Sequence, residues 1–300
     1  MSSVLWSVLR MGAAVYVGLC LVVWIRQGRY VYYPDRAVNV TPGDVGLDFE
    51  EVVIPTADGE KLAAWFVPGP EGTETAATVL FCHGNAGDIG DRLWSVRTFH
   101  ALGMNVLIFD YRGYGNSSGR PTERGTYLDG RAVWDYLTGV RRIPARRIVL
   151  FGRSLGGAVA SYLACEVAAG AAVLESTFSS APDMARRMFP LLPGRLVCRF
   201  KYDTVSRAGR LKCPVLVAHS RDDEMIPFDQ AERIFEACPE PKRFVAMRGG
   251  HNDGGLDGDE AYQTALREFV ARWVRGEGPS PASGLRRSPR GTRAPVAGDR

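Results

Sequence analysis

One stretch near the middle of the chain, residues 148–157, most constrains the fold, because it predicts a buried strand, a tight turn and the start of a helix. Its first four residues are apolar and mostly β-branched or aromatic, while the stretch that follows up to Val167 is rich in alanine, as in a helix packed on a sheet. Ser154 lies at the joint, where the backbone must be strained. The residues two before and two after it approach each other too closely to carry side chains, and Gly152 and Gly156 meet this demand. The pattern therefore predicts a serine presented on a sharp turn at the end of a strand.

Apolar runs typical of strands alternate with helical patterns over most of the chain. The expected strands are residues 49–54, 61–67, 77–82, 105–109, 148–151, 171–174, 214–219 and 243–247, and the main expected helices are residues 91–102, 125–138, 155–167 and 259–274. The first two strands are joined by the turn Ala57-Asp58-Gly59 and should form an antiparallel hairpin. The alternation after them predicts an α/β fold with a mostly parallel, eight-stranded sheet and helices on both faces.

The amino-terminal segment predicts a membrane anchor. Residues 4–25 form an almost wholly apolar run, which at about 1.5 Å per residue is long enough to cross the roughly 30 Å hydrocarbon layer. Arg10 lies near the start, where it can reach the headgroups, and Trp6 and Trp24 stand where interfacial aromatic residues are expected. A cleaved signal peptide is the alternative, but no small-x-small cleavage site follows the run. We expect an uncleaved single-pass anchor over residues 1–30.

The rest of the chain divides into a globular domain over residues 31–275 and a tail over residues 276–300. The tail consists mainly of Pro, Ser, Gly, Ala and Arg without apolar periodicity, which indicates disorder. Its five arginines and two acidic residues account for three of the four net positive charges of the chain. The globular domain therefore has no basic excess that would indicate a nucleic-acid partner.

The six cysteines show neither Cys-x-x-Cys spacing nor a dense disulfide framework. We interpret them as small buried apolar residues, which favours a reducing compartment, while a Cys198–Cys213 disulfide stays open as an alternative. The positive charges beyond the run, Arg26, Arg29 and Arg36, are opposed by Arg10 and the amino terminus at its start, which leaves the orientation of the anchor undecided. Our expectation is a membrane protein whose globular domain faces the cytoplasm.

Functional groups of an open α/β sheet collect just beyond the carboxyl ends of its strands, and this chain places polar residues there. His83, Gly84 and Asn85 follow residues 77–82, Asp110 to Gly115 follow residues 105–109, Asp222 and Asp223 follow residues 214–219, and His251 follows residues 243–247. The order of serine, aspartate and histidine along the chain is that of α/β-hydrolase triads, and Gly-x-Ser-x-Gly is the pattern of their nucleophile elbow.

This set of residue types suits acyl transfer. A serine hydroxyl is a weak nucleophile until a base takes its proton, and an imidazole does so when a carboxylate fixes its tautomer. We assign Ser154 as the nucleophile and His251 as the base, against the alternative of a structural histidine in a glycine-flanked loop. Spacing alone does not separate Asp222 from Asp223 as the acid.

Four motifs together resemble the Bem46-like group of α/β-hydrolases: His-Gly-Asn-Ala-Gly, Asp-Tyr-Arg-Gly-Tyr-Gly-Asn-Ser-Ser-Gly, Gly-Arg-Ser-Leu-Gly-Gly and Gly-His-Asn-Asp. The similarity extends from about residue 33 to residue 274. The run from His219 to Pro227 is similar to a His-Gly-x-x-Asp-x-x-Val-Pro segment whose acid lies four residues after the histidine, with Ser220 in place of the glycine. The resemblance therefore implies Asp223 as the triad acid.

Acyl transfer also needs backbone N–H groups for the developing oxyanion. One is expected from Leu155, directly after the nucleophile and at the start of a helix. The other is implied by the similarity of His83-Gly84-Asn85 to a His-Gly-x oxyanion turn, which gives Asn85, with Ala86 as the alternative and His83 as a brace of the loop. We expect no cofactor and no metal.

A lid-like insert is expected over residues 176–212. Its apolar residues either wall an acyl pocket or pack onto the sheet: Met188, Phe189, Leu191, Leu192 and Leu196. The leading hypothesis is a membrane-anchored serine hydrolase of the carboxylesterase or thioesterase type, acting on a small-molecule or lipid-like acyl substrate. A serine peptidase or amidase on the same triad, and a scaffold without catalysis, are the alternatives.

Overall fold

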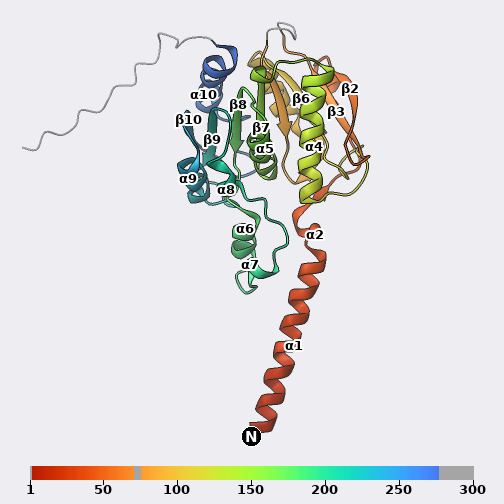
Figure 1. The fold of residues 1–300 in the computed structure, drawn as a ribbon, viewed down its shortest axis with the longest axis vertical. Helices are drawn as coiled ribbons and strands as arrows, with labels where there is room; N and C mark the ends of the chain where they lie inside the picture. Colours follow the sequence, from red (N-terminus) through yellow and green to blue (C-terminus); the bar gives the residue numbers. More distant parts are fainter. Residues whose placement is uncertain (1, 71–75, 277–300) are drawn as a thin grey trace, which may run out of the picture.

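An eight-stranded sheet forms the centre of the computed structural model, which describes residues 2–70 and 76–276 (Figure 1). The strand order is β10-β9-β8-β7-β4-β6-β3-β2. The strands are β2 (Glu50–Pro55), β3 (Lys61–Val67), β4 (Thr78–Cys82), β6 (Asn105–Phe109), β7 (Ile148–Arg153), β8 (Ala171–Glu175), β9 (Val215–Ser220) and β10 (Lys242–Met247). The pairs β2–β3 and β3–β6 are antiparallel and the others are parallel. The predicted sheet and its opening hairpin are confirmed.

Helices cover both faces of the sheet, as predicted. They are α3 (Leu93–Ala101), α4 (Glu123–Asp135), α5 (Leu155–Glu166), α8 (Thr204–Ala208), α9 (Phe228–Ala237) and α10 (Glu260–Val270). One apolar core joins the sheet to α4, α5, α8 and α9, and a second joins it to α3 and α10. Alternate residues of β4 explain both cores, because Leu80 enters the first and Phe81 the second. A strand buried on both sides must be apolar throughout, which is the pattern visible in the sequence.

Polar caps fix where two of these helices begin. Thr122 accepts a hydrogen bond from the Gly125 amide, so α4 begins at Glu123, two residues earlier than predicted. Asp259 accepts from the Tyr262 amide in the same way and precedes α10. Both caps stand at the ends of apolar periodic segments, where periodicity alone locates a boundary only approximately.

The amino-terminal helix α1 (Ser2–Arg26) extends away from the sheet (Figure 1). Its residues from Ser3 to Arg26 are long and apolar enough to cross a membrane, so α1 is a candidate transmembrane anchor. The chain continues through α2 (Gly28–Val31) into β1 (Tyr33–Pro34), which pairs with β5 (Ala86–Gly87) directly after β4. The candidate anchor is therefore tied to the globular domain at a strand end.

The insert after β8 contains α6 (Ala181–Met188) and α7 (Gly194–Val197), which lie on the same side of the globular part as α1 (Figure 1). Met188, Leu191 and Leu196 are exposed there, so these three do not pack onto the sheet. All six cysteines are free, and the alternative Cys198–Cys213 disulfide does not form. The predicted disordered tail lies outside the described residues apart from Gly276.

Candidate active site

Ser154 occupies a strained turn between β7 and α5. Its backbone has φ 54° and ψ −118°, a conformation that a residue with a side chain rarely adopts. A Cβ on Gly152 would lie 2.2 Å from the Gly156 carbonyl oxygen, so these two residues do approach too closely for a side chain. A Cβ on Gly156 would lie 1.9 Å from the carbonyl oxygen of Cys82 in β4. The neighbouring strand therefore adds a second reason for glycine at the elbow.

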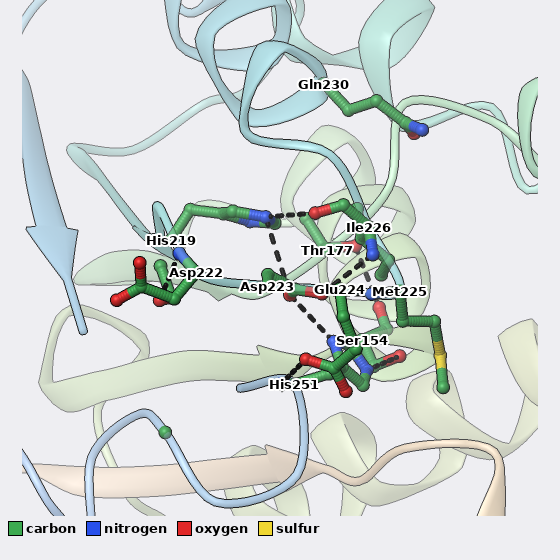
Figure 2. Close-up of polar contacts among 12 residues, drawn as sticks. Ser154, Thr177, His219, Asp222, Asp223, Glu224, Met225, Ile226, Gln230 and His251 are labelled. Carbon is green, nitrogen blue, oxygen red and sulfur yellow. Dashed lines mark hydrogen bonds and ion pairs between the residues drawn. The ribbon is translucent and has the colours of Figure 1, made fainter. Parts of the chain in front are cut away.

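The structure brings Ser154, His251 and Asp223 together in one hydrogen-bonded line (Figure 2). The distance from His251 Nε2 to Ser154 Oγ is 3.1 Å, and the distance from His251 Nδ1 to Asp223 Oδ2 is 2.8 Å. All three residues are buried. A carboxylate at Nδ1 holds the imidazole proton on that nitrogen, which leaves Nε2 free to accept the serine proton. The arrangement can therefore generate a serine nucleophile.

Asp223, and not Asp222, reaches the histidine. Asp223 Oδ1 accepts hydrogen bonds from the amides of Met225 (2.9 Å) and Ile226 (2.7 Å), which fixes the carboxylate in the plane that faces His251. Burial by itself raises the pKa of Asp223, but the hydrogen bonds from His251 and Ile226 outweigh it and bring the pKa below its ordinary value. The carboxylate is therefore ionised at neutral pH. Asp222 is exposed.

Two neighbouring side chains, one acid and one histidine, support the hydrogen-bonded line of Ser154, His251 and Asp223. Glu224 Oε2 accepts a hydrogen bond of 3.0 Å from the His251 amide. His219 donates from Nε2 to the Ile226 carbonyl (2.9 Å), and the same atom lies 3.5 Å from Asp223 Oδ2. Burial lowers the pKa of His219, so it is neutral beside the carboxylate. His219 thus holds the loop that carries the acid.

The loop after β4 carries the expected oxyanion residues next to the serine. A Cβ on Gly84 would lie 3.8 Å from Ser154 Cβ, and Asn85, Ala86 and Leu155 line the same cavity as Ser154. The amide of Leu155 is the first of α5 and has no partner within the helix. Both expected donors therefore lie at the cavity, and the alternative Ala86 lies there too.

Asn85 is held on three sides. Its carbonyl oxygen accepts hydrogen bonds from the Tyr33 amide (2.9 Å) and from the Tyr114 hydroxyl (2.7 Å), and its side-chain amide donates to the Val31 carbonyl (2.8 Å). Two of these three partners come from the segment that leads from the candidate anchor into the domain. The loop that carries the expected oxyanion residues is therefore braced by the amino-terminal segment, which no local sequence pattern indicated.

His83 acts as a brace in the same loop. It is fully buried, donates from Nδ1 to the Gly84 carbonyl (2.8 Å) and packs against the rings of Tyr111 and Tyr114. Burial, helped by the charge of Arg92, lowers its pKa to about 3. His83 is therefore neutral and lies outside the hydrogen-bonded line of Ser154, as expected for a structural histidine.

Arg153 and Glu175 form a supporting pair that sequence reasoning missed. The Arg153 guanidinium donates to the carbonyl oxygens of His251 (3.0 Å) and Gly254 (3.1 Å), and its Nε lies 3.4 Å from Glu175 Oε1. Glu175 is fully buried at the end of β8, where burial raises its pKa and the charge of Arg153 opposes the rise. The pair holds the loop of His251 against the elbow. The sequence positions of the two residues could have indicated the pair, because Glu175 stands at a strand end and Arg153 directly precedes the nucleophile.

A cavity of about 700 Å³ opens beside Ser154 and His251. Its apolar walls come from two separate parts of the chain: Met184, Met188 and Phe189 of the insert, and Val23 and Tyr30 of the amino-terminal segment. Among residues 2–70 and 76–276, no group of three His, Cys, Asp or Glu side chains is arranged to hold a metal ion. The site can therefore present an acyl group to an activated serine with the side chains and amides already described.

The chain is similar to known proteins in sequence and in fold. The family model described as alpha/beta hydrolase fold matches residues 77–197. The protein bem46 of Schizosaccharomyces pombe is 35% identical over 240 residues, which cover 77% of this chain and 79% of that protein. An uncharacterized membrane protein of Saccharomyces cerevisiae, YNL320W, is 32% identical over 283 residues, covering 89% and 98%. An esterase of Pyrococcus furiosus has the same fold, with a TM-score of 0.66 at 22% identity over 81% of this chain and 99% of that structure.

Proposed function

This chain belongs to the Bem46-like group of α/β-hydrolases, and from that premise we propose that it is a membrane-anchored serine hydrolase that cleaves carboxylic ester or thioester bonds of lipid-like acyl substrates. The observation that carries the proposal is the continuous line from Asp223 through His251 to Ser154 at the wall of an apolar cavity. The candidate transmembrane helix and the membrane protein among its relatives support the anchoring.

The first half of the reaction forms an acyl-enzyme. Ser154 Oγ attacks the acyl carbonyl carbon while His251 Nε2 takes the hydroxyl proton, and Asp223 stabilises the imidazolium that results. The carbonyl oxygen becomes an oxyanion, for which the amides of Leu155 and Asn85 are the proposed donors. Such amides are fixed before the reaction begins, and losing one donor costs a factor of about 10² to 10³ in rate. His251 then gives its proton to the departing alcohol or thiol.

The second half releases the acid. Water enters, loses a proton to His251 Nε2 and attacks the acyl carbonyl of the ester on Ser154. The tetrahedral intermediate collapses with return of the proton to Ser154 Oγ, so the free carboxylic acid leaves and the serine is restored. Each proton moves between Ser154 Oγ, the leaving group, water and one ring nitrogen of His251.

The lining of the cavity favours an apolar acyl group. The methionine and phenylalanine side chains of α6 and its following turn face the same space as Ser154. Burial of each methylene of an acyl chain contributes about 0.8 kcal/mol to binding. A longer acyl chain therefore gains more from this cavity than a short one.

An active-site-directed fluorophosphonate tests the mechanism on the full-length protein in detergent. We expect covalent labelling of the wild type and none of Ser154→Ala, with turnover of esters and thioesters above that of matched anilides. Absence of labelling in the wild type, or labelling that survives Ser154→Ala, would remove the mechanism. Preference for anilides would instead favour an amidase.

A further inference from the structure

One face of the candidate anchor packs against the insert that carries α6 and α7. Tyr16, Cys20, Val23 and Gln27 are spaced by four, three and four residues, which places the first three on a single face of α1 and Gln27, the residue that follows α1, in line with them. The Tyr16 hydroxyl donates to the Leu191 carbonyl at 2.8 Å. This face is therefore an intramolecular contact, whereas most of α1 is exposed.

Gln27 fastens the domain end of the same face. Its side-chain amide donates to the Val197 carbonyl, and its side-chain oxygen accepts from the Arg199 amide at 2.7 Å. The Arg199 guanidinium lies 4.7 Å from the centre of the Trp24 ring. A tryptophan beside an arginine is typical of the membrane–water boundary, so this level of α1 corresponds to the interface.

The contact of Tyr16 sets the depth of the insert. Tyr16 precedes Gln27 by eleven residues, which corresponds to about 16 Å along the helix axis. If α1 spans a hydrocarbon layer of roughly 30 Å, the chain around Leu191 lies well inside that layer. The insert is thus placed alongside the anchor, at membrane depth.

The side chains of the insert suit that position. Leu191 is 86% exposed and Leu196 is 84% exposed. The segment from Met188 to Val197, the tip of the insert, therefore presents apolar surface that no described part of the chain covers. The arginines at the end of α6 turn toward other partners, since Arg186 pairs with Asp183 and Arg187 donates to the Glu224 carbonyl. Arg195 is the one charged residue between Met188 and Val197, and it stands two positions before Val197, at the end of the segment that Gln27 contacts at the level of the interface. An otherwise apolar tip with its preceding charges held by the domain is what a lipid surface would accept.

The cavity of Ser154 opens between these two elements. Val23 of α1, Gln27 directly after it, and Met188, Phe189 and Leu192 of the insert line the same space as Ser154 and His251. The rings of Tyr30 and Phe189 meet edge to face at 5.9 Å between their centroids. Anchor and insert therefore both contribute apolar walls to one cavity that also contains the nucleophile.

We propose that the segment from Met188 to Val197 is inserted in the lipid leaflet beside α1, and that the acyl chain of a membrane-resident ester reaches Ser154 laterally from the bilayer between these two walls. This inference rests on the proposed hydrolase function. It adds that α1 is a wall of the substrate site as well as a tether. The acyl chain keeps its apolar surroundings throughout, since it passes from lipid into the cavity without crossing water.

A double variant of the tip tests the insertion in the full-length protein. Leu191→Asp with Leu196→Asp is reconstituted in phosphatidylcholine vesicles and assayed on a long-chain acyl ester in the vesicles and on a water-soluble butyrate ester. Val53→Asp with Val140→Asp is the matched control, because both residues are exposed apolar residues of the globular domain. We expect the tip variant to lose about tenfold or more on the vesicle ester, because charged side chains oppose insertion. Its butyrate turnover and fluorophosphonate labelling should match the control.

A second variant tests the passage. Val23→Trp narrows the cavity from the side of α1 and should shift the preferred acyl chain to a shorter length. Equal activity of tip variant and control on the vesicle ester, or an unchanged chain-length profile of Val23→Trp, would overturn the inference. Failure of the proposed function is distinct, because the wild type would then neither turn over butyrate esters nor react with the fluorophosphonate.

Discussion

Substitution of Asp223 by asparagine changes the one atom that faces His251. The Oδ1 atom can still accept from the amides of Met225 and Ile226, which keeps the side chain in its present plane. The atom opposite His251 Nδ1 then becomes an amide nitrogen, a donor in place of an acceptor. The imidazole must turn its lone pair toward the asparagine and carry its proton on Nε2, so it can no longer accept from Ser154.

The expected loss follows from this change of tautomer. We expect kcat on a soluble ester to fall about 10⁴-fold, as for a triad whose acid is replaced by its amide, which corresponds to about 5.4 kcal/mol of activation free energy. The free energy of unfolding should change by only about 1 to 2 kcal/mol, because one charge-assisted hydrogen bond is lost from an otherwise intact loop. Since the pKa of Asp223 is lowered in the folded protein, its contribution to stability is present at neutral pH and is lost in acid as the carboxylate protonates.

Asp222→Asn is the matched control, one residue away and exposed. Ester turnover, the rate of fluorophosphonate labelling and urea unfolding are measured for both variants. Asp222→Asn should keep wild-type values in all three. The reasoning is refuted if Asp223→Asn keeps turnover within about tenfold of the wild type, or if the two variants lose turnover equally.

Two further variants examine the buried charges around the site. Arg153→Met removes the guanidinium from the His251 loop and leaves Glu175 without its cation, so kcat should fall about tenfold or more and the free energy of unfolding by about 3 kcal/mol at pH 8. Urea unfolding at pH 5 should show a smaller loss of unfolding free energy, because the raised pKa of Glu175 lets the carboxylate protonate. Equal losses at both pH values would contradict this. Burial and the neighbouring Asp88 raise the pKa of Asp110 to about 8. Folding therefore favours the protonated carboxyl group. The free energy of unfolding should decline by up to about 1.4 kcal/mol per pH unit as the pH rises from about 4 to about 8. Asp110→Asn should remove that decline, and an unchanged slope would exclude Asp110 as its source.

The sheet and the elbow were predictable because their causes are local. A strand buried on both faces is apolar at every position, and this is visible in residues 148–151 without any tertiary information. The glycines on both sides of Ser154 follow from the backbone of the turn itself. The second constraint on Gly156, from the Cys82 carbonyl, depends on which strand lies beside β7 and so was not contained in the motif.

The proposed triad acid is a residue that local sequence patterns could not identify. Asp222 and Asp223 are adjacent in a loop, and only the family resemblance favoured the second. The structure explains the difference, because the amides of Met225 and Ile226 turn the carboxylate of Asp223 toward His251 while Asp222 faces solvent. Loop dihedrals, which periodicity does not report, decide between the neighbours.

The contacts of the candidate anchor were outside the reach of any local pattern. Gln27 and Val197 are separated by 170 positions, and a glutamine at the end of an apolar run reads as a solvated boundary residue. Its burial depends on the insert folding back beside α1. The hydrophobic run predicted a span, but the pairing of one face of that span with Leu191 and Val197 is a tertiary event.

The connection from α1 to the sheet links membrane position to catalytic geometry. Only a few residues separate Gln27 from Tyr33, and over that distance the chain braces Asn85 through the Val31 carbonyl and the Tyr33 amide. A flexible tether would leave the domain free to move relative to α1, whereas these hydrogen bonds hold the loop at the wall of the cavity to the chain that follows α1. A rigid link has a catalytic consequence as well, because a displacement of residues 31–33 would move the carbonyl of Asn85 and with it the loop proposed to hold the oxyanion. With α1 in a membrane as proposed, lipid packing around it has a short mechanical route to the loop proposed to hold the oxyanion.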